Sequence, residues 1–308
     1  MKINATDNFF TRAKPIWAKG LEKEKNITLG LYKNIRCESG SAILKIAASG
    51  FYRVFVNGKF TYFGPARCAH GYYRVDEIEL DLKKGENNIA IETVNYYVNS
   101  FYSLMQSGFI EAELVSDGAA AAVTDEAGEN AFELYELCER IRRVQRYSYQ
   151  RPFAEAYRLT EDFCGWRTGA NGANVSPRSV VITDEKCLLP RNIPASTFTE
   201  VSPCSSVCGG SAVFGIKPEK YRKDRSLIYI KNPASGNLEG FFENELCEHL
   251  SDEVQEIRSE ITDDRRTEYS GNTALGAGEF EILEFPCEKT GFITADIKCS
   301  EESVLLFL

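Results

Sequence analysis

Apolar and polar residues alternate with a period of two along much of the chain. In residues 77–82 (EIELDL) and 109–114 (FIEAEL), every second side chain is apolar and acidic residues lie between them. This alternation predicts half-buried β-strands. Residues 89–94 (IAIETV) are apolar on both faces, which predicts a central strand covered on both sides. Further strands are predicted at residues 41–48, 51–56 and 59–63.

Turn signals separate these strands. Asn57-Gly58 lies between two apolar runs and predicts a two-residue hairpin turn of type I′, which needs positive φ at both positions. Residues 118–130 predict either a hairpin with its tip at 124–128 or a short helix. Because no strand–helix alternation is visible, the pattern favours an all-β fold, a β-sandwich or jelly roll, over a doubly wound sheet.

The pattern also suggests a division of the chain. Residues 1–190 are predicted to form a jelly-roll β-sandwich, and residues 191–220, rich in Ser, Pro, Gly and Cys, a linker or wrapping segment. A second β-unit is predicted at residues 221–308, from strand-like runs at 226–230, 280–285, 292–297 and 304–308. The chain stops inside the last apolar run, which favours a truncated second unit and a longer parent protein.

Charge and targeting signals narrow the functional classes. The formal net charge is −9, which disfavours nucleic acid or an anionic membrane as the main partner, because both repel an acidic surface. The longest basic patch, residues 140–143 (RIRR), is short and lies among glutamates. No signal-peptide pattern and no apolar run of about 20 residues is present, so a cytoplasmic location and reduced cysteines are expected.

Candidate nucleophiles and metal ligands are sparse. The chain has only two histidines, and His70 lies two positions from Cys68, which leaves a small Cys-dependent enzyme as a disfavoured alternative. Cys204 and Cys208 have near-metal spacing, but no second ligand pair follows, whereas zinc normally takes four ligands. No metal or other cofactor is therefore expected. Arg67 and Arg74 are expected to pair with acidic neighbours such as Asp76.

Aromatic and acidic residues suggest a link to carbohydrate. Five tyrosines fall near predicted strand ends and are candidate sugar-stacking residues: Tyr72, Tyr73, Tyr96, Tyr97 and Tyr102. Aromatic residues are also common strand formers, so core or rim positions remain the alternative. A pair of carboxylates suffices for glycoside hydrolysis, but spacing selects no pair among Glu155, Glu161, Asp162, Asp263 and Asp264.

Several short motifs carry a resemblance to a known family. They are the YRVFVNG hairpin at 52–58, GPAR at 64–67, YRVD at 73–76, GENNIA at 85–90 and LPRNIP at 189–194. In this order they resemble the N-terminal β-sandwich of bacterial α-L-rhamnosidases and related glycoside hydrolases. Similar hairpins occur in other galactose-binding-like sandwiches. The resemblance covers most of the chain and is strongest over residues 51–96.

The resemblance implies a role without catalysis. In the family, the catalytic acids lie on a downstream helical barrel, and this sequence contains no matching motif, so no catalytic residue is carried over. The chain is expected to be a scaffold or accessory carbohydrate-binding part of such a glycosidase, with rhamnose-containing or other plant glycans and the missing downstream catalytic domain as partners. A stand-alone carbohydrate-binding or interaction protein is the alternative. The five tyrosines would then contact either a sugar or the absent domain.

Overall fold

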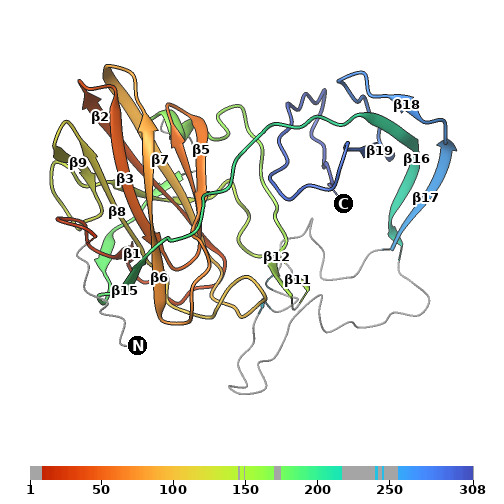
Figure 1. Cartoon of the computed structure of the whole chain (residues 1–308). Helices are drawn as coiled ribbons and strands as arrows, with labels where there is room; N and C mark the ends of the chain where they lie inside the picture. The colour runs from red at the N-terminus through yellow and green to blue at the C-terminus, as the bar shows by residue number, and fades with distance from the viewer. Residues whose placement is uncertain are drawn as a thin grey trace. The chain divides into compact units, whose positions relative to one another are not determined.

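The computed structural model describes residues 9–144, 146–148, 150–169, 175–216, 240–241, 245 and 256–307 (Figure 1). These residues form β-strands and one short 3-10 helix, η1 (Gly165–Thr168), which confirms the all-β prediction. Within them, no helix has the length and apolar character needed to cross a membrane. The chain forms two compact units, Met1–Ser196 with Lys217–Val254, and Thr197–Ile216 with Gln255–Leu308.

The first unit contains two large sheets. One sheet has the order β14-β1-β8-β3-β6-β15, with β9 paired to β8. Its strands are β1 (Ile16–Ala18), β3 (Ser41–Ala48), β6 (Tyr72–Asp81), β8 (Ile110–Ser116), β9 (Ala119–Val123), β14 (Val180–Ile182) and β15 (Cys187–Pro190). All of these pairings are antiparallel except that of β15 with β6, which is parallel.

The other sheet has the order β13-β10-β2-β7-β4-β5. Its strands are β2 (Ile27–Cys37), β4 (Phe51–Val56), β5 (Lys59–Gly64), β7 (Gly85–Asn95), β10 (Glu133–Leu137) and β13 (Val175–Pro177). β7 lies between β2 and β4, which confirms the central strand predicted from its apolar sequence. A small separate hairpin pairs β11 (Arg146–Ser148) with β12 (Arg151–Phe153).

The core lies between the two sheets and follows the alternation of the sequence. Ile78 and Leu80 of β6 are buried, whereas the acidic residues between and beside them are exposed. Leu29 and Leu31 of β2 and Ile89 of β7 face the same core from the second sheet. Burial of one face of each strand is what sets its register, because a slip of one residue would expose the apolar set.

Two tight turns determine the neighbouring hairpins. Asn57 (φ 51°) and Gly58 (φ 78°) both have positive φ, as the predicted type I′ turn requires. Asp117 (φ 52°) and Gly118 (φ 80°) form a second such turn between β8 and β9. The turn at 124–128 leads from β9 to β10, which belong to different sheets, so it is not the tip of a hairpin, and residues 118–130 form no helix.

The second unit contains a four-stranded sheet. β16 (Ser205–Ile216) pairs with β17 (Glu256–Asp263), β18 (Thr267–Glu268) and β19 (Glu279–Glu284). β19 matches a predicted strand, and β16 lies inside the segment expected to be a linker. Residues 292–297 and 304–307 form no strand, so those two predictions were wrong. The run at 226–230 lies outside the described residues.

A buried carboxylate connects the two sheets of the first unit. Asp76 on β6 is fully buried and accepts a hydrogen bond from the hydroxyl of Tyr52 on β4. Arg191 donates from Nη1 to Asp76 Oδ1 at 2.5 Å and to the Tyr62 hydroxyl at 2.8 Å. A buried charge must be paired and hydrogen-bonded. Here the hydrogen-bond donor and the cation both come from parts of the chain outside β6.

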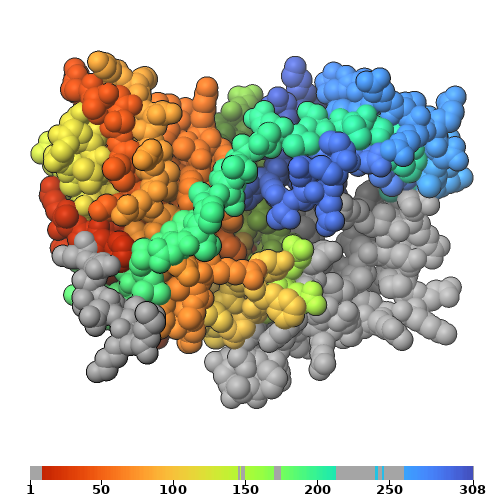
Figure 2. Space-filling view, in the orientation of Figure 1, coloured from red at the N-terminus to blue at the C-terminus, as the bar shows by residue number. Residues whose placement is uncertain are grey.

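The expected partner of Asp76 was wrong. Arg74 donates instead to main-chain carbonyl oxygens, including those of Arg67 at 3.0 Å and Arg191 at 2.6 Å. The parallel register of β15 on β6 brings the residue after β15 beside Asp76. β15 and residues 191–196 lie at the surface of the first unit (Figure 2). Arg191 is therefore the cation that neutralises the buried carboxylate.

Replacing Arg191 with methionine should destabilise the first unit. The substitution keeps an unbranched side chain but leaves a buried carboxylate without its cation, and we expect a loss of roughly 2–3 kcal/mol, near the lower bound for breaking a buried pair. Urea unfolding followed by tryptophan fluorescence measures it, because both tryptophans, Trp17 and Trp166, belong to this unit.

The matched control is Arg36→Met. The Arg36 side chain is 69% exposed and pairs only with other exposed groups, so its loss should leave the unfolding midpoint unchanged. Equal destabilisation by both substitutions would contradict the role of Arg191.

Candidate functional site

The structure separates the five tyrosines that the sequence suggested. Tyr72 and Tyr102 are exposed, at 38% and 45%, whereas Tyr73 and Tyr97 are half-buried. Tyr96 is 6% exposed and belongs to an apolar cluster that includes Val94, Val98 and Phe153. None of the five lines either of the two pockets described below.

Two of these tyrosines already interact with other side chains of the protein. The Tyr73 hydroxyl donates to Gln106 Oε1 at 2.9 Å. The guanidinium groups of Arg67 and Arg151 lie 5.0 and 5.6 Å from the centre of the Tyr102 ring. A guanidinium group over an aromatic face is attracted to the ring, and a sugar that stacked on the same face would compete with it.

The suggested cysteine–histidine pair shows no catalytic geometry. Cys68 is half-buried and His70 is exposed, both in the loop between β5 and β6. No hydrogen bond joins them within the described part of the chain, and no third group orients the imidazole there. In the same described ranges, no three His, Cys, Asp or Glu side chains gather in a way that would hold a metal ion.

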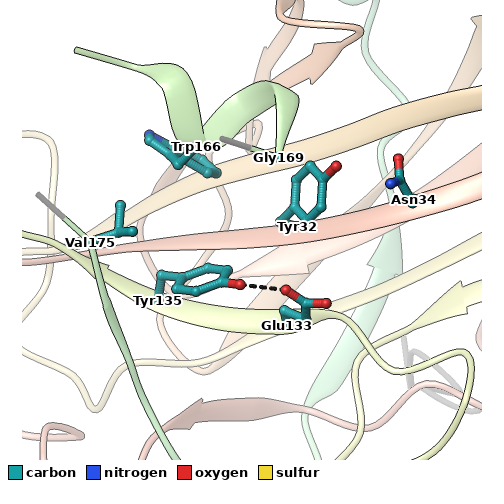
Figure 3. A pocket seen from close by; sticks show the side chains of 7 residues that line it. All are labelled: Tyr32, Asn34, Glu133, Tyr135, Trp166, Gly169 and Val175. Atoms are coloured by element: carbon teal, nitrogen blue, oxygen red, sulfur yellow. Dashed lines mark hydrogen bonds between the residues drawn. The ribbon is translucent and has the colours of Figure 1, made fainter. Parts of the chain in front are cut away.

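A pocket of about 220 Å³ lies on the face of the second sheet that points away from the core (Figure 3). It combines aromatic rings with a carboxylate and an amide. Its lining residues are Tyr32, Asn34, Glu133, Tyr135, Trp166, Gly169 and Val175. Tyr32 and Asn34 come from β2, Glu133 and Tyr135 from β10, and Trp166 from η1.

Strand register brings these side chains together. On β2, Leu29 and Leu31 face the core, so Tyr32 and Asn34 point to the outer face. β10 pairs antiparallel with β2 and places Glu133 opposite Tyr32. The pocket thus joins side chains that are about a hundred residues apart in the sequence, at one edge of the outer face.

Two glycines leave room for the rings. A Cβ at Gly30, on β2, would lie 2.8 Å from Trp166 Cζ3, so the indole packs directly on the strand. Gly169, just after η1, has φ +86°, and a Cβ there would lie 2.4 Å from the Tyr32 hydroxyl oxygen. Glycine is the residue that tolerates both this φ and this close approach.

Hydrogen bonds orient the polar groups of the pocket. The Tyr135 hydroxyl donates to Glu133 Oε2, as Figure 3 shows, and the Tyr32 hydroxyl donates to Asn88 Oδ1 at 3.2 Å. Burial, together with Glu133, raises the pKa of Tyr135 to about 12. The same two causes raise the pKa of Tyr32. Both phenols therefore remain neutral hydrogen-bonding groups at ordinary pH.

A buried ion network holds η1 against the sheet. Glu92 on β7 pairs with Arg53 Nη2 at 2.5 Å and with Arg167 Nη2 at 3.1 Å. Burial alone would raise the pKa of Glu92, but the two arginines outweigh it and lower that pKa. The Arg167 guanidinium also lies 3.9 Å from the centre of the Phe55 ring. Because Arg167 directly follows Trp166, this network fixes the indole beside the pocket.

Replacing Glu133 with glutamine should lower the pKa of Tyr135 from about 12 toward its ordinary value of 10, because the negative charge that opposes ionisation is removed. The pKa of Tyr135 is about 12 in the folded protein and 10 in the unfolded chain, so the folded state favours the neutral phenol. The contribution of Tyr135 to the free energy of unfolding is therefore complete below pH 10 and is lost as the pH rises from 10 to 12. The difference in tyrosinate absorbance between each protein and its Tyr135→Phe counterpart measures this pKa.

The control is Glu136→Gln on the same strand. Glu136 pairs with Arg178 and is not among the groups that raise the pKa of Tyr135, so that pKa should not move. An unchanged pKa in Glu133→Gln would show that the hydrogen bond to Tyr135 does not form.

No protein-family model matches the chain, and no curated protein matches it by sequence. Among solved structures, it resembles the GH78 family rhamnosidase of Bacillus sp. GL1, with a TM-score of 0.55, 27% identity, and coverage of 66% of this chain and 22% of that one. The α-L-rhamnosidase of Aspergillus terreus matches with a TM-score of 0.44 and 14% identity, over 91% and 37% of the two chains. The Pleurotus ostreatus lectin matches with a TM-score of 0.35 and 16% identity, over 60% and 46%.

Of these three likenesses, that to the Bacillus enzyme is close enough to support an argument. The chain spans 22% of that enzyme's length, well under two thirds. It is therefore structurally related to one part of a GH78 rhamnosidase.

Proposed function

We propose that this chain is a non-catalytic, carbohydrate-binding part of an α-L-rhamnosidase-like protein, and that the aromatic pocket on β2 and β10 is its sugar site. The observation that carries the proposal is the joining of tyrosine rings to a carboxylate and an amide in one pocket of about 220 Å³. Ligand pockets characteristically combine apolar walls with a few polar groups that fix orientation.

The chemistry of the pocket suits a sugar. A pyranose presents C–H groups on its faces and hydroxyls on its rim. The Tyr135 ring supplies an apolar face with a polar tip, and Glu133 and Asn34 are exposed groups that can hydrogen-bond hydroxyls. The buried Trp166 also lines the pocket. Nothing in the arrangement requires a metal ion.

The structural likeness to a GH78 rhamnosidase suggests the class of glycan. L-Rhamnose and rhamnose-containing plant oligosaccharides are the first ligands to test. The catalytic domain would belong to a longer parent protein, in which this chain would act as scaffold or as accessory binding region. Binding through Tyr72 and Tyr102, or use of that surface against the catalytic domain, is the competing placement.

Tyr135→Ala should weaken the binding of a rhamnose-containing oligosaccharide about tenfold, about 1.4 kcal/mol, because the ring face is lost. Calorimetric titration measures the affinity, and Trp166 fluorescence reports the occupied pocket because the indole lines it. The matched control is Tyr102→Ala, an exposed tyrosine on another surface. If Tyr102→Ala loses binding and Tyr135→Ala retains it, the sugar site lies at the surface around Tyr102. Absence of binding by the unmodified chain would refute the proposal.

The chain alone should not hydrolyse aryl rhamnosides. No carboxylate pair on a helical barrel is present in the described residues, and the chain covers a minor part of the related enzyme. Release of nitrophenol from nitrophenyl α-L-rhamnoside, compared with buffer alone, measures this. Hydrolysis that a single carboxylate substitution abolishes would contradict the non-catalytic role.

A further inference from the structure

A second pocket of about 270 Å³ lies in the first unit, where β2 begins and β10 ends. Its distinguishing feature is arginine. Residues 140–143, the short basic patch of the sequence, form one side of it through Arg140, Arg142 and Arg143, and Arg158 joins them from a distant segment. In a chain whose net charge is −9, this is a local concentration of positive charge.

Neighbouring carboxylates offset this charge only in part. Four arginines and one glutamate line the pocket, and that glutamate, Glu136, pairs with Arg178. Arg142 pairs with Glu24 and also donates from Nε to the carbonyl oxygen of Lys25. Arg143 and Arg158 are exposed and form no ion pair with any described residue. Their guanidinium groups are therefore available to an anion.

Arg140 adds one donor that the described residues leave unused. Its side chain is 5% exposed and lies 3.3 Å from Glu155 Oε1. That contact is an ion pair made by its Nη2, whereas its Nε has no hydrogen-bond partner within the described residues. A buried donor without a partner costs free energy, and a ligand that reaches it recovers that cost.

Asn26 contributes an unused acceptor to the same pocket. Its Nδ2 donates to the carbonyl oxygen of Arg142 at 2.8 Å, which assigns the orientation of the amide. Its Oδ1 is buried and has no hydrogen-bond partner among the described residues. The pocket thus presents an unsatisfied donor, Arg140 Nε, and an unsatisfied acceptor, Asn26 Oδ1, together.

This combination selects a class of ligand. Guanidinium groups recognise planar oxyanions such as carboxylates through paired hydrogen bonds. A buried amide oxygen needs a donor, which a hydroxyl group supplies. A sugar acid carries both groups on one small ring. Sulfate carries acceptors only, so it would leave Asn26 Oδ1 unsatisfied.

We propose that this arginine-lined pocket binds the carboxylate-bearing unit of an acidic saccharide. The proposal rests on the carbohydrate-binding function above and adds that one unit of the bound saccharide carries a carboxylate. Both pockets open on the outer face of β2, with Thr28 lining one and Tyr32 the other. Thr28 and Tyr32 are four positions apart on the strand, about 13 Å. The indole of Trp166 covers the strand between them at Gly30, so an oligosaccharide of a few units would have to pass over it to reach both.

Calorimetric titration with D-glucuronate, D-glucose and sulfate tests the proposal on the unmodified chain. We expect glucuronate to bind, glucose to bind at least tenfold more weakly, and sulfate to fall well below glucuronate. Added salt should weaken glucuronate binding, because the main contact is between charges. Equal binding of sulfate and glucuronate would reduce the pocket to a general anion site and overturn the inference.

The double substitution Arg143→Ala/Arg158→Ala should weaken glucuronate binding at least tenfold. Both side chains are exposed, so the fold should survive, and the unfolding transition checks this. Lys59→Ala/Lys84→Ala removes the same charge from exposed positions outside the pocket and should change nothing. Arg143→Lys/Arg158→Lys keeps the charge without the planar fork and should give intermediate affinity. Unchanged binding in the alanine double variant would overturn the proposal.

The two proposals fail in different ways. Loss of neutral rhamnoside binding in Tyr135→Ala, with glucuronate binding intact, supports separate pockets. Glucuronate binding by a chain that binds no neutral sugar would refute the proposed function and leave the acid-binding pocket standing. Binding of neutral sugars without any preference for glucuronate would support the proposed function and refute the acid-binding pocket.

Discussion

The first unit depends on the neutralisation of one buried charge. Asp76 lies on one sheet, Tyr52 and Tyr62 on the other, and Arg191 on the segment that closes the unit. A carboxylate removed from water is strongly unfavourable unless all of its partners are in place. Gly64 permits this approach, since a Cβ there would lie 2.4 Å from Asp76 Oδ2. Hydrophobic burial drives the sheets together, and this network specifies how they meet.

A covering layer on the outer face of the second sheet organises both pockets. The segment that follows β10 carries η1 over β2, β7 and β4. Glu92 on β7 holds it through Arg167, and Arg53 on β4 pairs with the same carboxylate. Trp166 packs in the middle of β2, on the position of Gly30. The aromatic pocket and the arginine-lined pocket lie on either side of this indole. The two pockets lie where the covering segment leaves the outer face of the second sheet uncovered.

Local sequence patterns predicted the strands and hairpins of the sandwich because one face of each strand is buried by the opposite sheet. The same alternation predicted strands wrongly at 292–297 and 304–307, since a strand also needs an edge to pair with, which its own sequence does not contain. The aromatic pocket carried no local signal. Only the register of β10 on β2 brings Glu133 to Tyr32, and only β15 brings Arg191 to Asp76.

The late position of β15 has a consequence for how the unit is made and how it can be divided. Arg191 follows every strand of the two large sheets along the chain, so Asp76 can gain its counter-ion only after all of those strands have been synthesised. The same dependence governs dissection of the gene. A boundary placed before residue 187 removes an edge strand and a counter-ion together, whereas a boundary after 196 retains both.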